Sequence, residues 1–249
     1  MFSDLKFDEI FNGIRHSLSD MHAHTVLVVE DSPLNARLFR TLLSRAGLLV
    51  TVAVDAETAL DTLDRLTPDV ILMDMQLPGM SGDELTRRLK ADPARRGILI
   101  IAVTANNSSA DRQIMIESGC DGFISKPIVP ADFVAAVMTF IPEGEPALPA
   151  SVSKGECAEE EQFLRLKRKF LSEGVVESQD LLGGDAKLVG CILHRWIGCG
   201  GSAGILEISE RAQTIRDLIC RRAADLTALT VEAEAVKRLF SDALAACPS

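Results

Sequence analysis

The sequence predicts an α/β domain built on a five-stranded parallel sheet, followed by an all-α four-helix bundle. The first observation is a set of five short apolar runs between residues 25 and 125, each bounded by turn residues. The second is that segments with helical spacing of apolar residues separate these runs, a pattern typical of parallel sheets covered on both faces. The third is that residues 157–249 contain no strand-like alternation but four helical segments with short connections, which favours a bundle.

Turn and cap residues set the expected limits of the first elements. Ser32-Pro33 is a typical helix start, because Pro is well suited to the first helical turn. Gly47 marks the end of that helix, and Asp55 caps the next one, which Pro68 ends. From these signals we expect strands at residues 25–29 and 48–54, and helices at residues 33–46 and from 56 to about 66.

The third apolar run, residues 69–74, ends in Asp74 and is followed at once by a Pro-Gly turn. An apolar run bounded by turn residues predicts a strand buried on both faces. The next helix is closed by Asp92-Pro93, and Gly119 ends the one after it. We therefore expect further strands at residues 69–74, 98–103 and 122–125, and helices at residues 82–90, 112–117 and 130–140.

Composition and charge exclude several classes of protein. The formal net charge of -10 disfavours nonspecific binding to nucleic acid or to an anionic membrane. No helix-turn-helix with a basic recognition helix is visible, so a DNA-binding regulator is not expected. No apolar run is long enough to span a bilayer, and no secretory signal is visible. The six cysteines form no C-x-x-C pair, and we expect a cytoplasmic protein.

Polar side chains stand at four of the five predicted strand ends: Glu30 and Asp31, Asp74, Thr104 and Lys126. In open α/β sheets the chemistry lies at the carboxyl ends of the strands. Carboxylates in one crevice repel each other unless a cation is present, and an all-oxygen ligand set favours Mg²⁺ over zinc. A carboxylate can also attack phosphorus and form an aspartyl-phosphate. The set therefore predicts phosphoryl transfer onto Asp74, although Asp74 alone could equally be a cap for the following loop.

Residues 24–142 resemble a receiver domain of bacterial two-component response regulators, which has a flavodoxin-like fold. The resemblance rests on Glu30-Asp31, on Asp74 with the Leu77–Gly82 loop, on Thr104-Ala105 and on Lys126-Pro127. It implies that Asp74 is the phospho-acceptor, that Thr104 hydrogen-bonds the phosphoryl group and that Lys126 pairs with it. It also implies a Mg²⁺ site formed by Glu30, Asp31, Asp74 and the backbone carbonyl of Gln76.

The same resemblance gives roles to residues around the acceptor. Phe123 matches the family's aromatic switch position, where Tyr is common, so its switch would be one of packing only. Gln76 and Asn106 match positions that influence how fast the phosphoryl group hydrolyses. We expect phosphorylation to draw Thr104 toward the phosphoryl group and to turn Phe123 into the space it leaves. Such a protein would catalyse only its own phosphorylation and dephosphorylation and would not otherwise be an enzyme.

The second half begins after residues 143–156, whose Pro, Gly and acidic residues are typical of a linker. In residues 157–249, His194 is followed one turn later by Gly198 and Cys199, which resembles the phosphohistidine motif of histidine-phosphotransfer (HPt) domains. The small residues would let another protein's active site approach, so we expect the His194 imidazole to be exposed. The motif departs from the family at Ile197, where the family usually has a Lys that helps stabilise the phosphoryl group.

Two functions therefore stay open for the second half. The first is a phosphorelay step, in which the bundle carries phosphate on His194. The second is a docking module that has lost transfer, with Asp74 phosphorylation controlling its partner binding. Expected partners are a sensor histidine kinase or an HPt protein upstream and another protein downstream, with neither DNA nor membrane. Residues 1–23 predict an amphipathic helix that packs on its own domain or, alternatively, forms a homodimer contact or a partner-docking arm.

Overall fold

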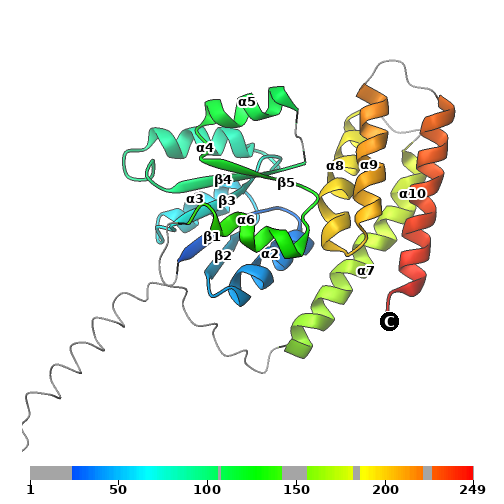
Figure 1. The fold of residues 1–249 in the computed structure, drawn as a ribbon, viewed down its shortest axis with the longest axis horizontal. Helices are drawn as coiled ribbons and strands as arrows, with labels where there is room; N and C mark the ends of the chain where they lie inside the picture. Colours follow the sequence, from blue (N-terminus) through cyan, green and yellow to red (C-terminus); the bar gives the residue numbers. More distant parts are fainter. Residues whose placement is uncertain (1–23, 106–107, 142–155, 182–185, 221–225, 249) are drawn as a thin grey trace, which may run out of the picture.

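The computed structural model describes residues 24–105, 108–141, 156–181, 186–220 and 226–248. Its first half contains a parallel sheet in the order β2-β1-β3-β4-β5, and the regular elements described in its second half are helices (Figure 1). The predicted fold class is confirmed. The predicted helix at residues 1–23 and nearly all of the predicted linker lie outside the described residues. The strands are β1 (Thr25–Val29), β2 (Leu49–Ala53), β3 (Val70–Asp74), β4 (Leu99–Thr104) and β5 (Gly122–Ser125).

Every residue of the central strand, β3, is buried, because helices cover both faces of the sheet. Side chains alternate between faces along a strand. In β1, Val26 and Val28 belong to one apolar cluster, which includes Phe39 of α2, whereas Leu27 and Val29 belong to the opposite one. The helices of this half are α2 (Pro33–Arg45), α3 (Ala56–Leu63), α4 (Gly82–Ala91), α5 (Ser109–Ser118) and α6 (Pro130–Met138).

The predicted start and stop signals are present at the ends of these helices. Ser32 caps α2, and the Asp55 carboxylate accepts a hydrogen bond of 2.7 Å from the Thr58 backbone N–H at the start of α3. Gly119 ends α5 with φ of +93°, a conformation that glycine adopts without strain. α5 begins earlier than predicted, because the Ser108 hydroxyl accepts a hydrogen bond from the Asp111 backbone N–H and caps the helix there.

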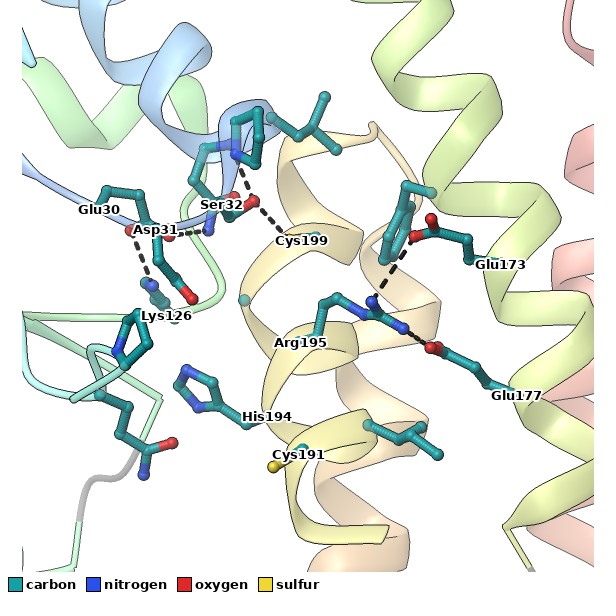
Figure 2. Close-up of a pocket in the computed structure, with 18 of the residues that line it drawn as sticks. Glu30, Asp31, Ser32, Lys126, Glu173, Glu177, Cys191, His194, Arg195 and Cys199 are labelled. Atoms are coloured by element: carbon teal, nitrogen blue, oxygen red, sulfur yellow. Dashed lines mark hydrogen bonds and ion pairs between the residues drawn. The ribbon is translucent and has the colours of Figure 1, made fainter. Parts of the chain in front are cut away.

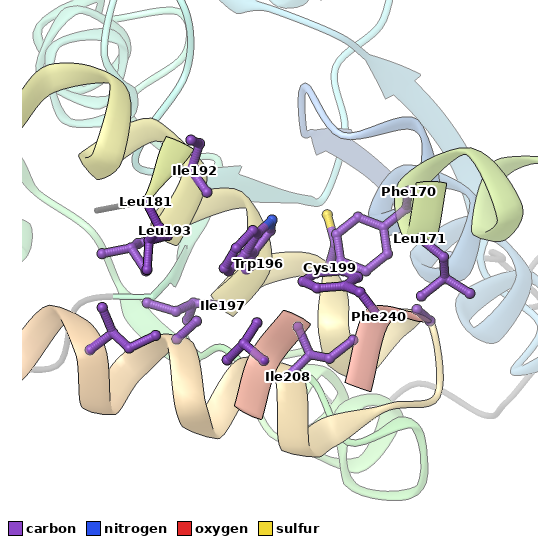
Figure 3. Close-up of a cluster of buried hydrophobic side chains, with 14 of the residues drawn as sticks. Phe170, Leu171, Leu181, Ile192, Leu193, Trp196, Ile197, Cys199, Ile208 and Phe240 are labelled. Atoms are coloured by element: carbon purple, nitrogen blue, oxygen red, sulfur yellow. The ribbon is translucent and has the colours of Figure 1, made fainter. Parts of the chain in front are cut away.

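The second half packs around one aromatic cluster (Figure 3). The Trp196 and Phe240 rings lie 4.8 Å apart between centroids, and both side chains are fully buried. α7 and α10 are the two longest helices of this half. None of the described helices combines the length and apolarity needed to cross a bilayer. The helices are α7 (Glu156–Asp180), α8 (Ala186–Ser202), α9 (Leu206–Cys220) and α10 (Leu226–Ala246).

The bundle is packed against the sheet domain. α7 and α8 both contact α2, and Figure 1 shows the bundle lying beside the sheet domain. Leu34 of α2 and Ala105, which follows β4, are buried within the apolar cluster of the bundle rather than within their own domain. The contact between the two halves therefore buries apolar side chains away from water. This contact lies at the edge of the sheet where the strands end.

Gly82 is required where the chain turns from β3 into α4. A Cβ at this position would overlap the backbone carbonyl of Asp74, which cannot move without displacing β3. We expect Gly82→Ala to lower the free energy of unfolding of the sheet domain by about 1–3 kcal/mol or more, the usual range for overpacking. Gly97→Ala is the control, since a Cβ there meets no atom within 4 Å. Urea unfolding of both variants measures the difference, and equal midpoints would contradict this reading.

Candidate functional site

Three carboxylates meet at the carboxyl edge of the sheet. Asp74 is the last residue of β3, and Glu30 and Asp31 follow directly after β1. β1 and β3 are parallel neighbours with Val29 opposite Met73, so their ends coincide. Carboxylate oxygens of the three residues lie within 4.8 Å of one another. The structure thus brings together the acidic residues that the sequence predicted at this edge, where the strand order reverses between β1 and β3.

Lys126 connects two of these carboxylates. Its Nζ donates hydrogen bonds to Asp74 at 2.6 Å and to Glu30 at 2.9 Å, and the three side chains are almost completely buried. Its backbone N–H donates to the Thr104 carbonyl at 2.7 Å, which joins the ends of β4 and β5. Burial alone would lower the pKa of Lys126, but the charges of Asp74 and Glu30 outweigh it and raise that pKa. Lys126 is therefore a permanent cation beside Asp74.

The acidic residues carry more negative charge than Lys126 balances. Burial raises the pKa of Glu30, and the neighbouring Asp74 charge adds to this effect against the lowering effects of Lys126 and Asn35. The Asp31 side chain reaches solvent, yet partial desolvation in the cleft and the Asp74 charge raise its pKa as well. Desolvation is the largest cause of both pKa shifts, and the negative charge of Asp74 adds to each. An all-oxygen donor set with excess negative charge fits a hard divalent cation.

Three further predicted residues surround this cluster. Thr104 ends β4 and is 4% exposed. The Gln76 backbone N–H donates to Asp74 at 3.0 Å, which holds the loop after β3 against the Asp74 carboxylate. Phe123 points outward and is 41% exposed, with the Arg112 guanidinium 5.0 Å from its ring centre. The predicted inward turn of Phe123 stays a prediction, and Asn106 lies outside the described residues.

A cleft of about 960 Å³ lies between the acidic cluster and the bundle (Figure 2). Glu30, Asp31 and Lys126 line it from the sheet domain, and His194 and Arg216 line it from the bundle. Figure 2 shows the His194 ring pointing from α8 toward the sheet domain, on the side where Lys126 and Asp31 lie. The prediction of an exposed imidazole is wrong: His194 is half-buried, because the chain's own first half covers it.

The small residues of α8 allow this close approach. A Cβ on Gly198 would lie 3.5 Å from Asn35 Nδ2 and 3.6 Å from Lys126 Cδ, so the helix backbone rests directly on the residues that bind Glu30. A Cβ on Gly201 would lie 2.9 Å from the Ile128 carbonyl oxygen, closer than side-chain carbons are found. The sequence predicted that these glycines make room for another protein's active site. In the structure they make room for the receiver-like half of the same chain.

Hydrogen bonds continue from the bundle to the acidic cluster. The Ser202 hydroxyl donates to Asn35 Oδ1 at 2.7 Å, and Asn35 Nδ2 donates to Glu30 at 2.8 Å. Cys199 Sγ and Ser32 Oγ lie 3.0 Å apart, and burial raises the pKa of the Cys199 thiol to about 12. No role was predicted for Asn35, Ser202 or Arg216. The only local signal was a polar Asn beside Leu34 on a helix face that is otherwise apolar.

His194 is held neutral in this cleft. Desolvation is the main cause that lowers its pKa to about 4, the charges of Lys126 and Arg216 act in the same direction, and the charge of Asp74 acts in the opposite direction. Since the docked pKa lies below the ordinary 6.5, docking favours the neutral imidazole and loses stability as pH falls below about 6.5.

We expect NMR titration of His194 to give a midpoint well below 6 in the wild type. In Gly198→Arg, which separates the two surfaces, the midpoint should return to about 6.5. Equal midpoints would show that His194 is not covered.

Comparison with known proteins identifies part of this arrangement. Residues 26–138 match the family model for the response regulator receiver domain, which ends before α7 begins. The polar-differentiation response regulator DivK of Brucella anthropi is 39% identical over 117 residues, which cover 47% of this chain and 95% of that protein. DivK of Brucella ovis matches to the same extent.

Solved structures were compared as well. A putative response regulator from Chloroflexus aurantiacus is 29% identical with a TM-score of 0.45, covering 47% of this chain and 97% of that one. The receiver domain of the sensor histidine kinase PA1611 from Pseudomonas aeruginosa is 31% identical with a TM-score of 0.44, covering 47% and 97%. That structure is described as having a magnesium ion coordinated in its active-site cleft.

Proposed function

Because this chain belongs to the response regulator receiver family, we propose that it is a phosphorelay protein that accepts a phosphoryl group on Asp74 and carries it further on His194. The observation that supports acceptance on Asp74 is the buried ion pair with Lys126 at 2.6 Å, in a cluster with Glu30 and Asp31. A buried carboxylate held beside a permanent cation is oriented for attack, and the cation can balance the charge of an incoming phosphoryl group.

Each residue of the cluster has a separate task in this proposal. The Asp74 carboxylate is the nucleophile, Lys126 binds the phosphoryl oxygens, and the Thr104 hydroxyl donates a hydrogen bond to them. Glu30, Asp31, Asp74 and the Gln76 carbonyl would hold Mg²⁺, which supplies further positive charge to the phosphoryl oxygens when it is bound. Asn35 and Lys126 fix the orientation of Glu30 through its two carboxylate oxygens.

Phosphorylation of the full chain with acetyl phosphate and Mg²⁺ tests the proposal. We expect a label that alkali removes, as for an acyl phosphate on Asp74, and a fraction that alkali leaves intact, as for phosphohistidine on His194. His194→Gln should retain the first and lose the second. Absence of any label at Asp74 would contradict acceptance, whereas an alkali-sensitive label alone would contradict only the role of His194.

Metal binding gives an independent prediction. Asp31→Asn removes a charge from the acidic cluster without filling space, so we expect Mg²⁺ affinity to fall on the order of tenfold or more. Asp83→Asn is the control, because Asp83 pairs with Arg87 on the surface of α4 and is not part of the cluster. Titration with Mg²⁺ followed by amide chemical shifts measures both variants. If Asp31→Asn binds Mg²⁺ as tightly as the wild type, the metal site is misassigned.

A second candidate function for the bundle is docking without transfer. Two observations favour it: Ile197 is completely buried and carries no charge, and α8 is already in contact with α2. In this case phosphorylation of Asp74 would release the bundle to bind a downstream protein, and a sensor histidine kinase or an HPt protein would act upstream. His194→Gln would then leave signalling unaffected, whereas the phosphorelay requires it to fail.

A further inference from the structure

We infer that Ser202 of the bundle is a positioning residue for the cation site: through the Asn35 amide it orients Glu30, so that docking of the bundle and binding of a divalent cation strengthen each other. The inference rests on the proposed function, because it presupposes a Mg²⁺ site at Glu30, Asp31 and Asp74. It adds a residue of the bundle that acts on this site, and a regulatory link between the two halves of the chain.

The Asn35 side chain bridges the two halves and is 1% exposed. Its Oδ1 accepts a hydrogen bond of 2.7 Å from the Ser202 hydroxyl, and its Nδ2 donates one of 2.8 Å to Glu30. Gly198 lies one helical turn before Ser202 on α8, and a Cβ on it would be 3.5 Å from Asn35 Nδ2. An amide turned the other way would place its oxygen against the Glu30 carboxylate, where two acceptors repel each other. α8 therefore covers the amide and Ser202 fixes its orientation.

Glu30 is held in place through both of its carboxylate oxygens. Oε1 accepts the hydrogen bond from Asn35, and Oε2 accepts one of 2.9 Å from Lys126 Nζ. Each carboxylate oxygen keeps a further lone pair, so these bonds orient Glu30 without preventing it from binding a cation. A ligand that is already ordered loses less conformational freedom when the cation binds. Removing an outer partner of a ligating carboxylate accordingly lowers metal affinity.

Docking also makes a bound cation more favourable through charge. Carboxylate oxygens of Glu30, Asp31 and Asp74 lie within 4.8 Å of one another, and Lys126 pairs with two of these residues. When α8 covers Asn35, it excludes water beside this negative charge, which strengthens both the repulsion among the carboxylates and their attraction for a divalent cation. The cation therefore offsets a cost of docking. Because binding equilibria are reciprocal, docking raises the affinity for the cation by the same factor.

The docked bundle leaves the cation site open to solvent. The Asp31 side chain is exposed, and Glu30, Asp31 and Gln76 line the cleft of about 960 Å³ between the halves. Mg²⁺ usually keeps several of its water ligands in protein sites, and a cleft of this size accommodates them. Docking and cation binding are therefore compatible in one molecule.

Titration of the full chain with Mg²⁺, followed by amide chemical shifts, tests the action of Ser202. We expect Ser202→Ala to weaken Mg²⁺ binding about threefold to tenfold, the usual effect of losing one neutral hydrogen bond. Ser178→Ala is the matched control, because this buried hydroxyl donates to the Val175 carbonyl within α7. Wild-type Mg²⁺ affinity in Ser202→Ala would overturn the inference, and so would an equal loss of affinity in Ser178→Ala.

A double-mutant cycle tests the route through Asn35. Asn35→Ala removes the amide that connects Ser202 to Glu30, so we expect it to weaken Mg²⁺ binding by itself. Once the amide is absent, Ser202→Ala should cause little further loss, because the two substitutions interrupt the same connection. If Ser202→Ala weakens Mg²⁺ binding as much in the Asn35→Ala chain as in the wild type, the effect of Ser202 does not pass through Asn35.

Alkylation of Cys199 by iodoacetamide measures the reciprocal effect of the cation on docking. Cys199 is 3% exposed and its Sγ lies 3.0 Å from Ser32 Oγ of the receiver-like half, so the reagent reaches it when α8 lifts away. We expect saturating Mg²⁺ to slow this reaction in the wild type by about threefold to tenfold relative to the metal-free chain. Cys220 at the end of α9 is exposed, and its rate should not change. An unchanged Cys199 rate, or equal slowing of both cysteines, would contradict the link.

Asp31→Asn, titrated in parallel, separates failure of this inference from failure of the proposed function. Asp31 is a member of the acidic cluster itself, whereas Ser202 acts on the cluster from the bundle. Wild-type Mg²⁺ affinity in Asp31→Asn would show that the cation site is misassigned. If Asp31→Asn loses Mg²⁺ affinity while Ser202→Ala retains it, the cation site stands and the link to the bundle is overturned.

Discussion

Asp74→Ala is expected to abolish phosphorylation of the receiver domain while the sheet remains folded. The affinity for beryllofluoride, a phosphoryl mimic, should fall at least a hundredfold. Asp74 and Glu30 are both buried and both pair with Lys126, but only Asp74 lies at the end of the central strand. The fold should persist because Lys126 keeps its bond of 2.9 Å to Glu30. Fluorine NMR with beryllofluoride and Mg²⁺ measures the binding directly.

A surface substitution provides the control for this result. Asp83→Ala removes an Asp of α4 that pairs with Arg87 outside the cleft, and it should bind beryllofluoride like the wild type. If folded Asp74→Ala still binds beryllofluoride, or if the phosphoryl label of the wild type is found on Glu30 or Asp31, Asp74 is not the acceptor.

Gly198→Arg is expected to separate the bundle from the receiver domain. A Cβ at this position would already be in van der Waals contact with Asn35 and Lys126, so an arginine side chain must displace them or enter the cleft, where it adds a positive charge beside Lys126. Overpacking of this kind shifts the docked equilibrium by on the order of tenfold to a hundredfold or more. The radius of gyration should increase, and the amide shifts of Ser32 and Asn35 should approach those of an uncovered receiver.

Gly190→Arg makes the same change on the same helix. A Cβ at Gly190 meets no atom within 4 Å and the position is exposed, so this variant should stay docked. If both variants keep the wild-type radius of gyration and Ser32 shifts, α8 does not rest on the receiver in solution as the structure has it.

Local patterns predicted the receiver fold and its acidic cluster because each signal lies within a few residues of the element it defines. Asp74 ends an apolar run, and Ser32 and Asp55 cap the helices that follow. Parallel pairing then brings the ends of β1 and β3 together whatever the loops do. For the same reason the cluster of Glu30, Asp31 and Asp74 could be predicted without knowing the remainder of the fold.

The docking of the bundle could not be predicted in this way. Ser32 and Cys199, like Asn35 and Ser202, contact each other across 167 residues of sequence. Nothing in either local pattern specifies the other. The glycines of α8 did predict a close approach, but not which surface approaches, and so the imidazole of His194 was expected in solvent. The contact of Arg216 with the receiver domain could not be predicted either, because it depends on α9 passing beside the carbonyl of Ala105.

The most direct test of the account is paramagnetic relaxation of the two histidines whose positions are described, with Mn²⁺ replacing Mg²⁺ at the acidic cluster. His24 precedes β1 and Glu30 follows it, so His24 lies about 20 Å from the metal site along the strand. His194 faces the cluster across the cleft. We predict that sub-stoichiometric Mn²⁺ broadens the His194 ring signals beyond detection and leaves those of His24 visible. Equal broadening of the two would contradict the docking of α8 over the acceptor site.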